Sequence, residues 1–345
     1  MAAGGLTAPN SIKHADFVGE IRNHVSTFLL SKTITTTIMT PENQNADHLF
    51  GGLNVKYELD VPLAPFTWYG LGGPAKVMVH PSNKSDLSAV IKRCWQDQWP
   101  VYVLGSGANL LVADSGVDGV VIQLDDPEFK QVEFNPSHMT AGAGVDLPQL
   151  VLQTARAGLE GIECLSGIPA TVGGAVRMNA GGVFGDIGKS IHQVQVMDDR
   201  GMVSWRHHDN LKFNYRKTNI SELFILAAQF TLTPQDPQSV KARIKEIFQF
   251  KKKSQPLAAN SCGCAFKNPL KVPADVPKSA GMLIDRAGLK GHQIGGAKVS
   301  DQHANFVIAN DGASTSDVLA LLEHIGEVVY KQFGIRLERE IVVWP

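Results

Sequence analysis

The sequence of 345 residues has little cysteine, almost no net charge and no long apolar run, and each shortage excludes a class of protein. The four cysteines (Cys94, Cys164, Cys262 and Cys264) are too few for a disulfide framework, and no second Cys/His cluster at zinc spacing accompanies them. A formal net charge of −1 argues against nucleic-acid binding. No stretch approaches the roughly 18 apolar residues of a membrane span. We expect a cytoplasmic protein without a metal.

Helical and strand periodicities alternate along the chain after about residue 55, which predicts an α+β protein. Strands are predicted over residues 76–80, 101–105, 119–124 and 336–343. Helices are predicted over residues 85–98, 146–157, 239–253, 278–287 and 314–332. Between residues 161 and 230, glycines and β-branched residues favour strands and loops over long helices.

The periodicities divide the chain into three parts. Residues 1–50 are expected to be a poorly ordered or loosely docked extension, and Asp16, Glu20 and the scarcity of arginine argue against an organelle-targeting segment. Residues 51–235, with an internal division near 125, form a nucleotide-binding part, and residues 240–345 form a C-terminal part.

Two glycine-rich segments are candidate binding loops. In the first, over residues 104–112, closely spaced glycines after a strand let backbone N–H groups approach a phosphate, although many such turns bind nothing. The second, over residues 165–182, contains few charges and suits a large flat ligand, or else a tightly turned core loop. The candidate residues are Gly105, Ser106, Gly107, Asn109, Leu110, Gly167, Pro169, Thr171, Gly173, Gly174, Asn179 and Gly181.

Three further segments carry reactive side chains. Arg216, after Tyr215, offers a planar fork for a carboxylate but is equally consistent with a surface ion pair. Cys264 combines an acid-capable thiol with nearby Lys267 and Asn268, or is a small buried hydrophobe. In the final segment, Glu338 and Glu340 share one face of the predicted strand, and spacing alone does not distinguish an exposed carboxyl from one in a cleft.

These segments occur together in an order that resembles the UDP-N-acetylenolpyruvoylglucosamine reductase family, from about residue 53 to residue 344. The matching motifs are G-S-G-A-N-L-L-V, G-I-P-A-T-V-G-G-A-V-R-M-N-A-G, N-Y-R-K-T, S-Q-P, G-C-A-F-K-N-P, A-G-M-L-I-D-R-A-G-L-K-G and L-E-R-E-I. The resemblance implies an FAD-binding domain of the vanillyl-alcohol-oxidase (PCMH) type in two subdomains, followed by a C-terminal α+β substrate-binding domain.

The resemblance also implies a reaction with named residues. NADPH reduces non-covalently bound FAD, and UDP-N-acetylglucosamine enolpyruvate then receives hydride at C3 and a proton at C2, giving UDP-N-acetylmuramate. Arg216 would steady the substrate carboxylate, Glu340 would assist as an acid, and Cys264 would donate the proton. Tyr215, Lys267 and Asn268 would contact the substrate. The implied partners are these small molecules, with no nucleic acid and no membrane, and a monomer is one option for the assembly.

The sequence departs from the family pattern at three points. Cysteine replaces the common serine donor at position 264, and Ala108 replaces a serine in the first glycine-rich turn. Only a short stretch separates Arg216 from Ser254, which indicates the branch without an extra substrate-covering loop. Two alternatives remain at this point: an FAD oxidase of an alcohol or lactone, and a non-catalytic protein that keeps the fold.

Overall fold

The first sheet of the computed structural model is mainly parallel and has the strand order β1-β2-β5-β3. Its strands are β1 (Val55–Pro62), β2 (Pro74–Pro81), β3 (Val101–Leu104) and β5 (Val117–Gln123). Helix α3 (Lys84–Gln96) packs on it through Leu87, Val90, Ile91 and Cys94, which recur at helical spacing. The Asn83 side chain accepts a hydrogen bond from the Asp86 N–H and so begins this helix.

The second sheet is antiparallel and has the order β12-β11-β15-β7-β6. Three helices accompany it, and α6 packs against α4. The strands are β6 (Val132–Phe134), β7 (Met139–Gly142), β11 (Ile191–Met197), β12 (Val203–His207) and β15 (Phe224–Phe230). The helices are α4 (Leu147–Arg156), α5 (Val172–Arg177) and α6 (Pro237–Ser254).

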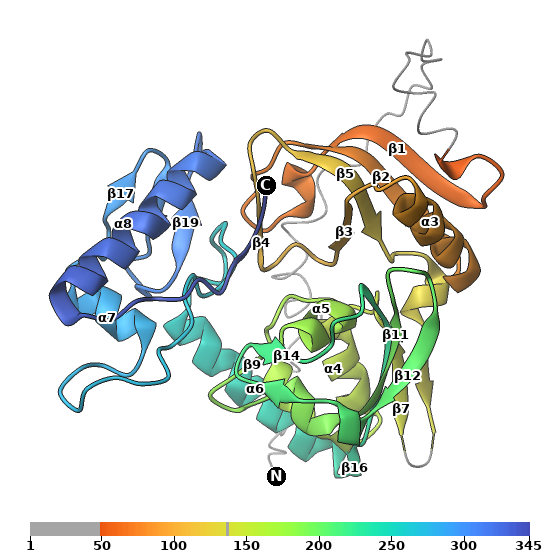
Figure 1. Cartoon of the computed structure of the whole chain (residues 1–345). Helices are drawn as coiled ribbons and strands as arrows, with labels where there is room; N and C mark the ends of the chain where they lie inside the picture. The colour runs from red at the N-terminus through yellow and green to blue at the C-terminus, as the bar shows by residue number, and fades with distance from the viewer. Residues whose placement is uncertain (1–48, 136–137) are drawn as a thin grey trace, which may run out of the picture. The chain divides into compact units, whose positions relative to one another are not determined.

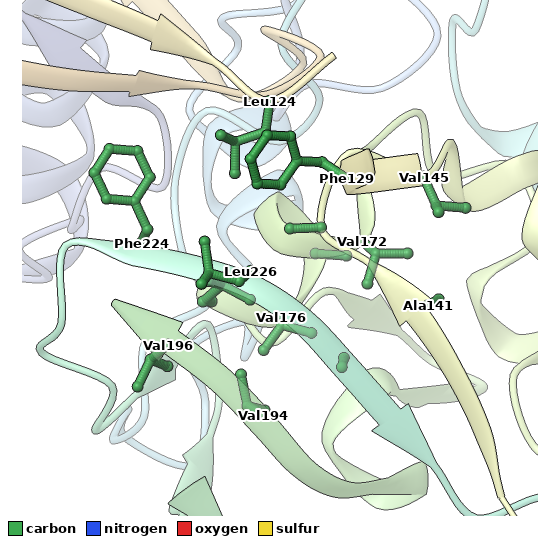
Figure 2. Packing of buried hydrophobic residues seen from close by; sticks show 14 of the residues in the cluster. Leu124, Phe129, Ala141, Val145, Val172, Val176, Val194, Val196, Phe224 and Leu226 are labelled. Carbon is green, nitrogen blue, oxygen red and sulfur yellow. The ribbon is translucent and has the colours of Figure 1, made fainter. Parts of the chain in front are cut away.

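One hydrophobic core joins these two sheets. Leu124 and Phe129, which follow β5, belong to the same buried cluster as Phe224 and Leu226 of β15 and Val176 of α5. Figure 2 shows these side chains converging between the strands and the short helix. Because apolar burial stabilises by about 25 cal/mol per Å², this shared core ties the two sheets into one N-terminal half.

The C-terminal part has its own core beneath a three-stranded sheet of β17 (Gln293–Ile294), β18 (Ala297–Val299) and β19 (Val307–Ala309). Two helices cover it, α7 (Ala280–Arg286) and α8 (Thr315–Phe333). Ser314 and Asp317 form a capping box at the start of α8, and Gly334, in the left-handed conformation, ends it.

The last strand returns to the first half of the chain. β20 (Val342–Trp344) pairs in parallel with β4 (Leu110–Val112), and the chain end lies beside β4 in Figure 1. The strand predicted over residues 336–343 is therefore wrong in extent. Arg339 makes only an isolated bridge to Phe266, because residues 338–340 exchange single hydrogen bonds with residues 265–267 instead of forming a ladder.

The structure describes residues 49–135 and 138–345, so the expected extension over residues 1–50 lies almost wholly outside the described residues. Residues 45–345 form one unit. Helix α6 belongs with the second sheet, so the proposed start of the C-terminal part at residue 240 falls inside this helix. Among the described residues, none of the helices combines the length and the apolar character that crossing a bilayer requires.

We expect Asp114→Ala to lower the free energy of unfolding by about 1–2 kcal/mol, because Asp114 caps α8 from the β4 side. Its carboxylate accepts hydrogen bonds from the Thr315 N–H at 2.9 Å and the Ser316 N–H at 3.2 Å. Partial burial raises the pKa of Asp114, but these hydrogen bonds outweigh it and leave the pKa below its ordinary value.

Denaturant unfolding measures this effect, with Asp118→Ala, an exposed carboxylate paired to Lys76, as the control. The carboxylate stabilises the fold above the ordinary carboxyl pKa, and this contribution disappears as the pH falls through the lowered folded-state pKa. Equal stability of wild type and Asp114→Ala near neutral pH would contradict the capping role.

Candidate functional site

A cavity of about 840 Å³ lies where the N-terminal half meets the C-terminal part, a size typical of ligand sites. Its wall includes the turn between β3 and β4, the loop before α5, the end of α6 and the segment around Cys264. Most of the candidate site residues lie on this wall: Gly105, Ser106, Gly107, Asn109, Leu110, Gly167, Pro169, Gly174, Asn179, Gly181, Tyr215, Arg216, Cys264, Asn268 and Glu340. Thr171, Gly173 and Lys267 do not.

The turn between β3 and β4 presents backbone donors. Among the described residues, no acceptor is found for the N–H groups of residues 106–109. Gly107 has a φ of 65°, and a Cβ there would collide with the Phe66 carbonyl. Consecutive unpaired N–H groups in a tight turn form an anion-binding concavity, so the donor set fits the diphosphate of a dinucleotide. Ser106 Oγ donates to Pro169 O at 3.0 Å and links this turn to the second glycine-rich loop.

Two polar residues of the second loop are used inside the protein. The Thr171 hydroxyl accepts from the Gly174 N–H at 3.3 Å and caps α5. Asn179 is 3% exposed; its Nδ2 donates to Asn214 O at 2.9 Å and its Oδ1 accepts from the Gly188 N–H at 3.1 Å. Thr171 and Asn179 were both predicted to contact the cofactor, whereas the structure gives the hydroxyl of Thr171 and the amide of Asn179 partners inside the protein. Their contact with the cofactor stays a prediction.

A hairpin of β13 (Phe213–Asn214) and β14 (Lys217–Thr218) carries Tyr215 and Arg216 at its two-residue turn. Arg216 has a φ of 53°, in the left-handed region that favours glycine. A charged residue held there costs on the order of 1 kcal/mol and persists only where surrounding contacts fix it. Such strain commonly marks a functional position.

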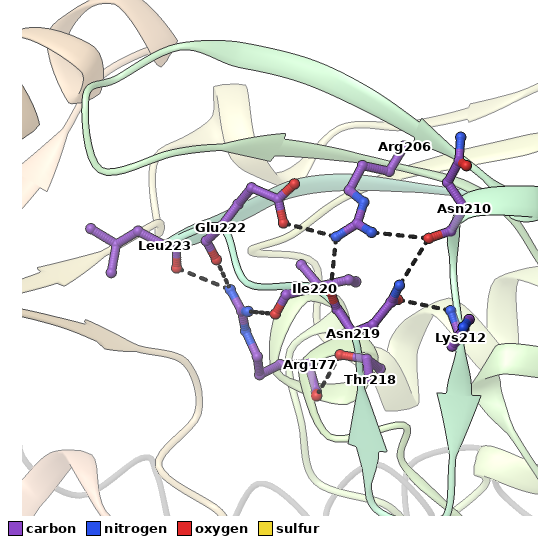
Figure 3. A network of polar contacts seen from close by, with 9 residues as sticks. All are labelled: Arg177, Arg206, Asn210, Lys212, Thr218, Asn219, Ile220, Glu222 and Leu223. Atoms are coloured by element: carbon purple, nitrogen blue, oxygen red, sulfur yellow. Dashed lines mark hydrogen bonds and ion pairs between the residues drawn. The ribbon is translucent and has the colours of Figure 1, made fainter.

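The contacts that fix this hairpin come from the end of α5. The Arg177 guanidinium donates to Ile220 O at 2.7 Å and to Glu222 O at 2.6 Å, while Thr218 Oγ1 donates to Arg177 O at 3.3 Å (Figure 3). The bond from Asn179 to Asn214 O holds the other strand. Arg177 lines the cavity, yet no local sequence signal pointed to it, because its partners lie more than 40 positions away.

Arg216 and Glu340 form a largely buried ion pair on the cavity wall. Arg216 Nε lies 2.5 Å from Glu340 Oε1, and the two side chains are 17% and 12% exposed. Arg216 Nη2 also donates to Gly181 O at 2.8 Å. Burial raises the pKa of Glu340, and the neighbouring Arg216 cation only partly opposes this. Glu340 therefore takes up a proton more readily than an exposed glutamate, which suits a group that assists as an acid.

The two cysteines of the C-G-C run have different surroundings. Cys262 Sγ lies 3.1 Å from Leu110 O and is buried. Cys264 lies on the cavity wall near Glu340. Burial, together with Glu340, raises the pKa of the Cys264 thiol to about 12, so the thiol keeps its proton at neutral pH.

The predicted substrate contacts separate into two groups. The guanidinium carbon of Arg216 lies over the ring of Tyr215, 5.2 Å from the ring centroid. The Tyr215 hydroxyl accepts a hydrogen bond from the Asn268 N–H at 3.2 Å. Lys267 instead pairs with Glu338, whose side chain is 73% exposed, at 2.6 Å. Lys267 is thus paired with a surface carboxylate, which the sequence analysis did not predict. Its contact with the substrate stays a prediction.

Lys251 is a cavity residue that the sequence analysis missed. Its side chain is 7% exposed and its Nζ donates to Ser166 O at 2.6 Å. No carboxylate among the described residues lies within ion-pair distance of it. It holds the second glycine-rich loop in place, and the run of three lysines in the sequence gave no sign of which one is buried.

Comparison with known proteins finds matches to both parts of the chain. Residues 75–205 match the model of an FAD binding domain, and residues 255–344 match the C-terminal domain of UDP-N-acetylenolpyruvoylglucosamine reductase. The reductase of that name from Halalkalibacterium halodurans is 36% identical over 281 residues, covering 81% of this chain and 91% of the relative. The one from Bacillus subtilis is 35% identical, covering 82% and 92%.

A solved structure agrees with these sequence matches. The crystal structure of the reductase from Thermus caldophilus superposes with a TM-score of 0.71 at 36% identity. The match covers 85% of this chain and 100% of that chain. The two-part arrangement of FAD-binding half and C-terminal domain is thus found in a homologous fold.

We expect the buried Lys251 ammonium to make stability depend on pH. Burial lowers its pKa from 10.5 to about 8. Between these values the unfolded chain binds more protons than the folded chain, so this group makes the free energy of unfolding rise with pH. The free energy of unfolding of wild type, relative to that of Lys251→Met, should therefore rise by about 2 kcal/mol from about pH 7 to about pH 9.5.

Guanidinium unfolding at a series of pH values measures this difference, with the exposed Lys253→Met as the control. A difference that stays constant with pH would show that the Lys251 ammonium carries no burial penalty.

Proposed function

Because the chain belongs to the UDP-N-acetylenolpyruvoylglucosamine reductase family, we propose that it reduces UDP-N-acetylglucosamine enolpyruvate to UDP-N-acetylmuramate with electrons from NADPH. The chain is an FAD-dependent oxidoreductase. The product is a precursor of peptidoglycan, and the reaction takes place in the cytoplasm. The observation that carries this proposal is the convergence of Arg216, Glu340 and Cys264 on the wall that also contains the glycine-rich turn.

The cofactor and the substrate need different parts of this wall. The N–H groups of residues 106–109 would hold the FAD diphosphate, and residues 167–170, with Gly174, line the space left for flat rings. Bound FAD supplies the hydride that is added to the substrate at C3. Between Arg216 and Ser254 the chain consists of strands, short connections and α6, so no covering loop is inserted there.

Arg216 and Glu340 serve the charge that develops on the substrate. Hydride addition at C3 leaves negative charge at C2, next to the substrate carboxylate. The Arg216 guanidinium, fixed by Glu340 and Gly181 O, is already oriented and does not need to reorganise as this charge forms. A Glu340 carboxyl that is protonated on substrate binding would donate a further hydrogen bond to the same region, and its raised pKa favours this.

Cys264 is assigned to protonate C2. A carbanion-like carbon is a much stronger base than a thiolate, so a thiol whose pKa is about 12 still transfers its proton favourably. The high pKa also keeps the donor fully protonated before the reaction. The thiolate that remains is then reprotonated from solvent as the product leaves.

Replacing Cys264 separates the two half-reactions. We expect Cys264→Ala to lower the turnover number by roughly 10²- to 10⁴-fold, the usual contribution of a general acid. Reduction of FAD by NADPH should keep its rate, because it needs no proton at C2. Cys264→Ser should restore part of the turnover, since a hydroxyl occupies the same place.

Stopped-flow absorbance of the flavin follows both steps, with Cys94→Ala, whose thiol lies beneath α3, as the control. Full turnover in Cys264→Ala would remove the donor assignment. An inactive wild type, which does not oxidise NADPH when the enolpyruvyl substrate is supplied, would remove the proposed function itself.

Glu340 should control one limb of the pH profile. If the protonated form is active, turnover falls as the pH rises through the pKa of Glu340, which lies above its ordinary value of 4.5. Glu340→Gln, which stays neutral, should lose this limb. Steady-state kcat against pH measures it, and Glu338→Gln, which removes a surface carboxylate, is the matched control. An unchanged limb in Glu340→Gln would assign it to another group.

A further inference from the structure

The main chain around Cys264 lies between two other segments. On one side, Cys264 bridges Phe306, and the Ala265 N–H donates to Asn305 O at 2.7 Å. On the other side, the Glu340 N–H donates to Ala265 O at 2.8 Å. Because Ala265 bonds to both neighbours, the thiol of Cys264 and the carboxyl of Glu340 come from segments whose relative register is fixed.

The side chain of Asn305 adds a second clamp to this segment. It is 3% exposed and lines the cavity. Its Oδ1 accepts from the Phe266 N–H at 3.0 Å, and its Nδ2 donates to Phe266 O at 2.8 Å. Since an N–H needs an acceptor and a carbonyl needs a donor, these two bonds settle which way the amide points. The Asn305 amide thus pairs with Phe266 as a neighbouring strand would.

One amide hydrogen of Asn305 remains after this pairing. An Nδ2 group carries two hydrogens, and Phe266 O takes one. The side chain of Asn305 lies close enough to Cys264 to lower the pKa of its thiol, against the larger effect of burial. The amide is therefore paired with the backbone two residues beyond the proton donor, and its second hydrogen is left for another acceptor.

An uncharged hydrogen-bond donor suits the position next to Cys264. Proton transfer leaves a thiolate in a desolvated place near Glu340, where an unpaired charge is costly. Arg216 offers positive charge, but it is already paired with Glu340 and is assigned to the substrate. An amide N–H stabilises the sulfur anion without adding a charge that would compete for the substrate carboxylate.

We propose that Asn305 is a positioning residue for the proton donor: it clamps the Cys264 segment through Phe266 and stabilises the thiolate through its remaining amide hydrogen. This inference rests on the proposed role of Cys264. The family motifs quoted above do not include Asn305. The effect of Asn305 on the reaction would pass entirely through Cys264.

Asn305→Asp tests the proposal because it keeps the size of the side chain and removes both amide hydrogens. Oxidation of reduced flavin by the enolpyruvyl substrate should slow by about 10- to 100-fold, the usual effect of losing a hydrogen bond to a charged group. The solvent deuterium isotope effect on this step should increase, since proton transfer becomes more rate-limiting. Flavin reduction by NADPH should keep its rate.

Two comparisons distinguish this role from a general loss of structure. In a Cys264→Ala background, Asn305→Asp should add little further slowing, because the residue acts through the thiol. A merely structural role would slow both backgrounds equally. Asn219→Asp is the matched control: that amide also spans two backbone groups, donating to Asn210 O and accepting from the Lys212 N–H, in the polar network of Figure 3.

The outcomes separate this inference from the proposed function. Wild type that does not turn over the enolpyruvyl substrate contradicts the function. Wild type that turns over, while Asn305→Asp shows the wild-type oxidation rate and isotope effect, contradicts the role of Asn305 alone. If Asn305→Asp does not fold, Asn305→Ser, whose side chain is too short to reach both Phe266 and the sulfur, is measured in the same way.

Discussion

The return of the C-terminal segment onto the glycine-rich turn is the constraint on which the site depends. Asn109 Nδ2 donates to Glu340 O at 3.1 Å, and the Val342 N–H donates to Asn109 O at 3.0 Å. The turn proposed for the diphosphate and the residue proposed as an acid are thereby neighbours through one asparagine. Such bonds join the walls of the cavity, which lies between two parts whose buried cores are largely separate.

Charge inside this cavity is balanced with few groups. Arg216 and Glu340 neutralise each other, the Cys264 thiol is neutral, and Lys251 is held only by carbonyl oxygens. In a desolvated place each unpaired charge is costly, so burial shifts the pKa values of Glu340, Cys264 and Lys251 toward the neutral forms of these groups.

The sequence predicted those features whose signals are local. The helices predicted over residues 85–98 and 314–332 and the glycines around residue 105 depend on signals within a few residues of the structure that they produce, and the family, fold class and FAD were confirmed. Arg177 and Asn305 were missed because their partners are distant in sequence. The same distance explains Asn179, whose amide donates to Asn214 O, whereas the Thr171 cap on Gly174 is local and was overlooked.

At position 216 the left-handed backbone favours a different residue from the one that the proposed reaction needs. Glycine or asparagine would fit that turn better, and with Arg216 replaced, Glu340 could simply remain protonated. Selection for heat resistance alone would therefore drive this position away from arginine, whereas selection for the role proposed for Arg216 would retain it. Residue 216 is consequently a place where an improved fold and an improved catalyst call for different amino acids, and its identity reports which of the two a lineage has needed.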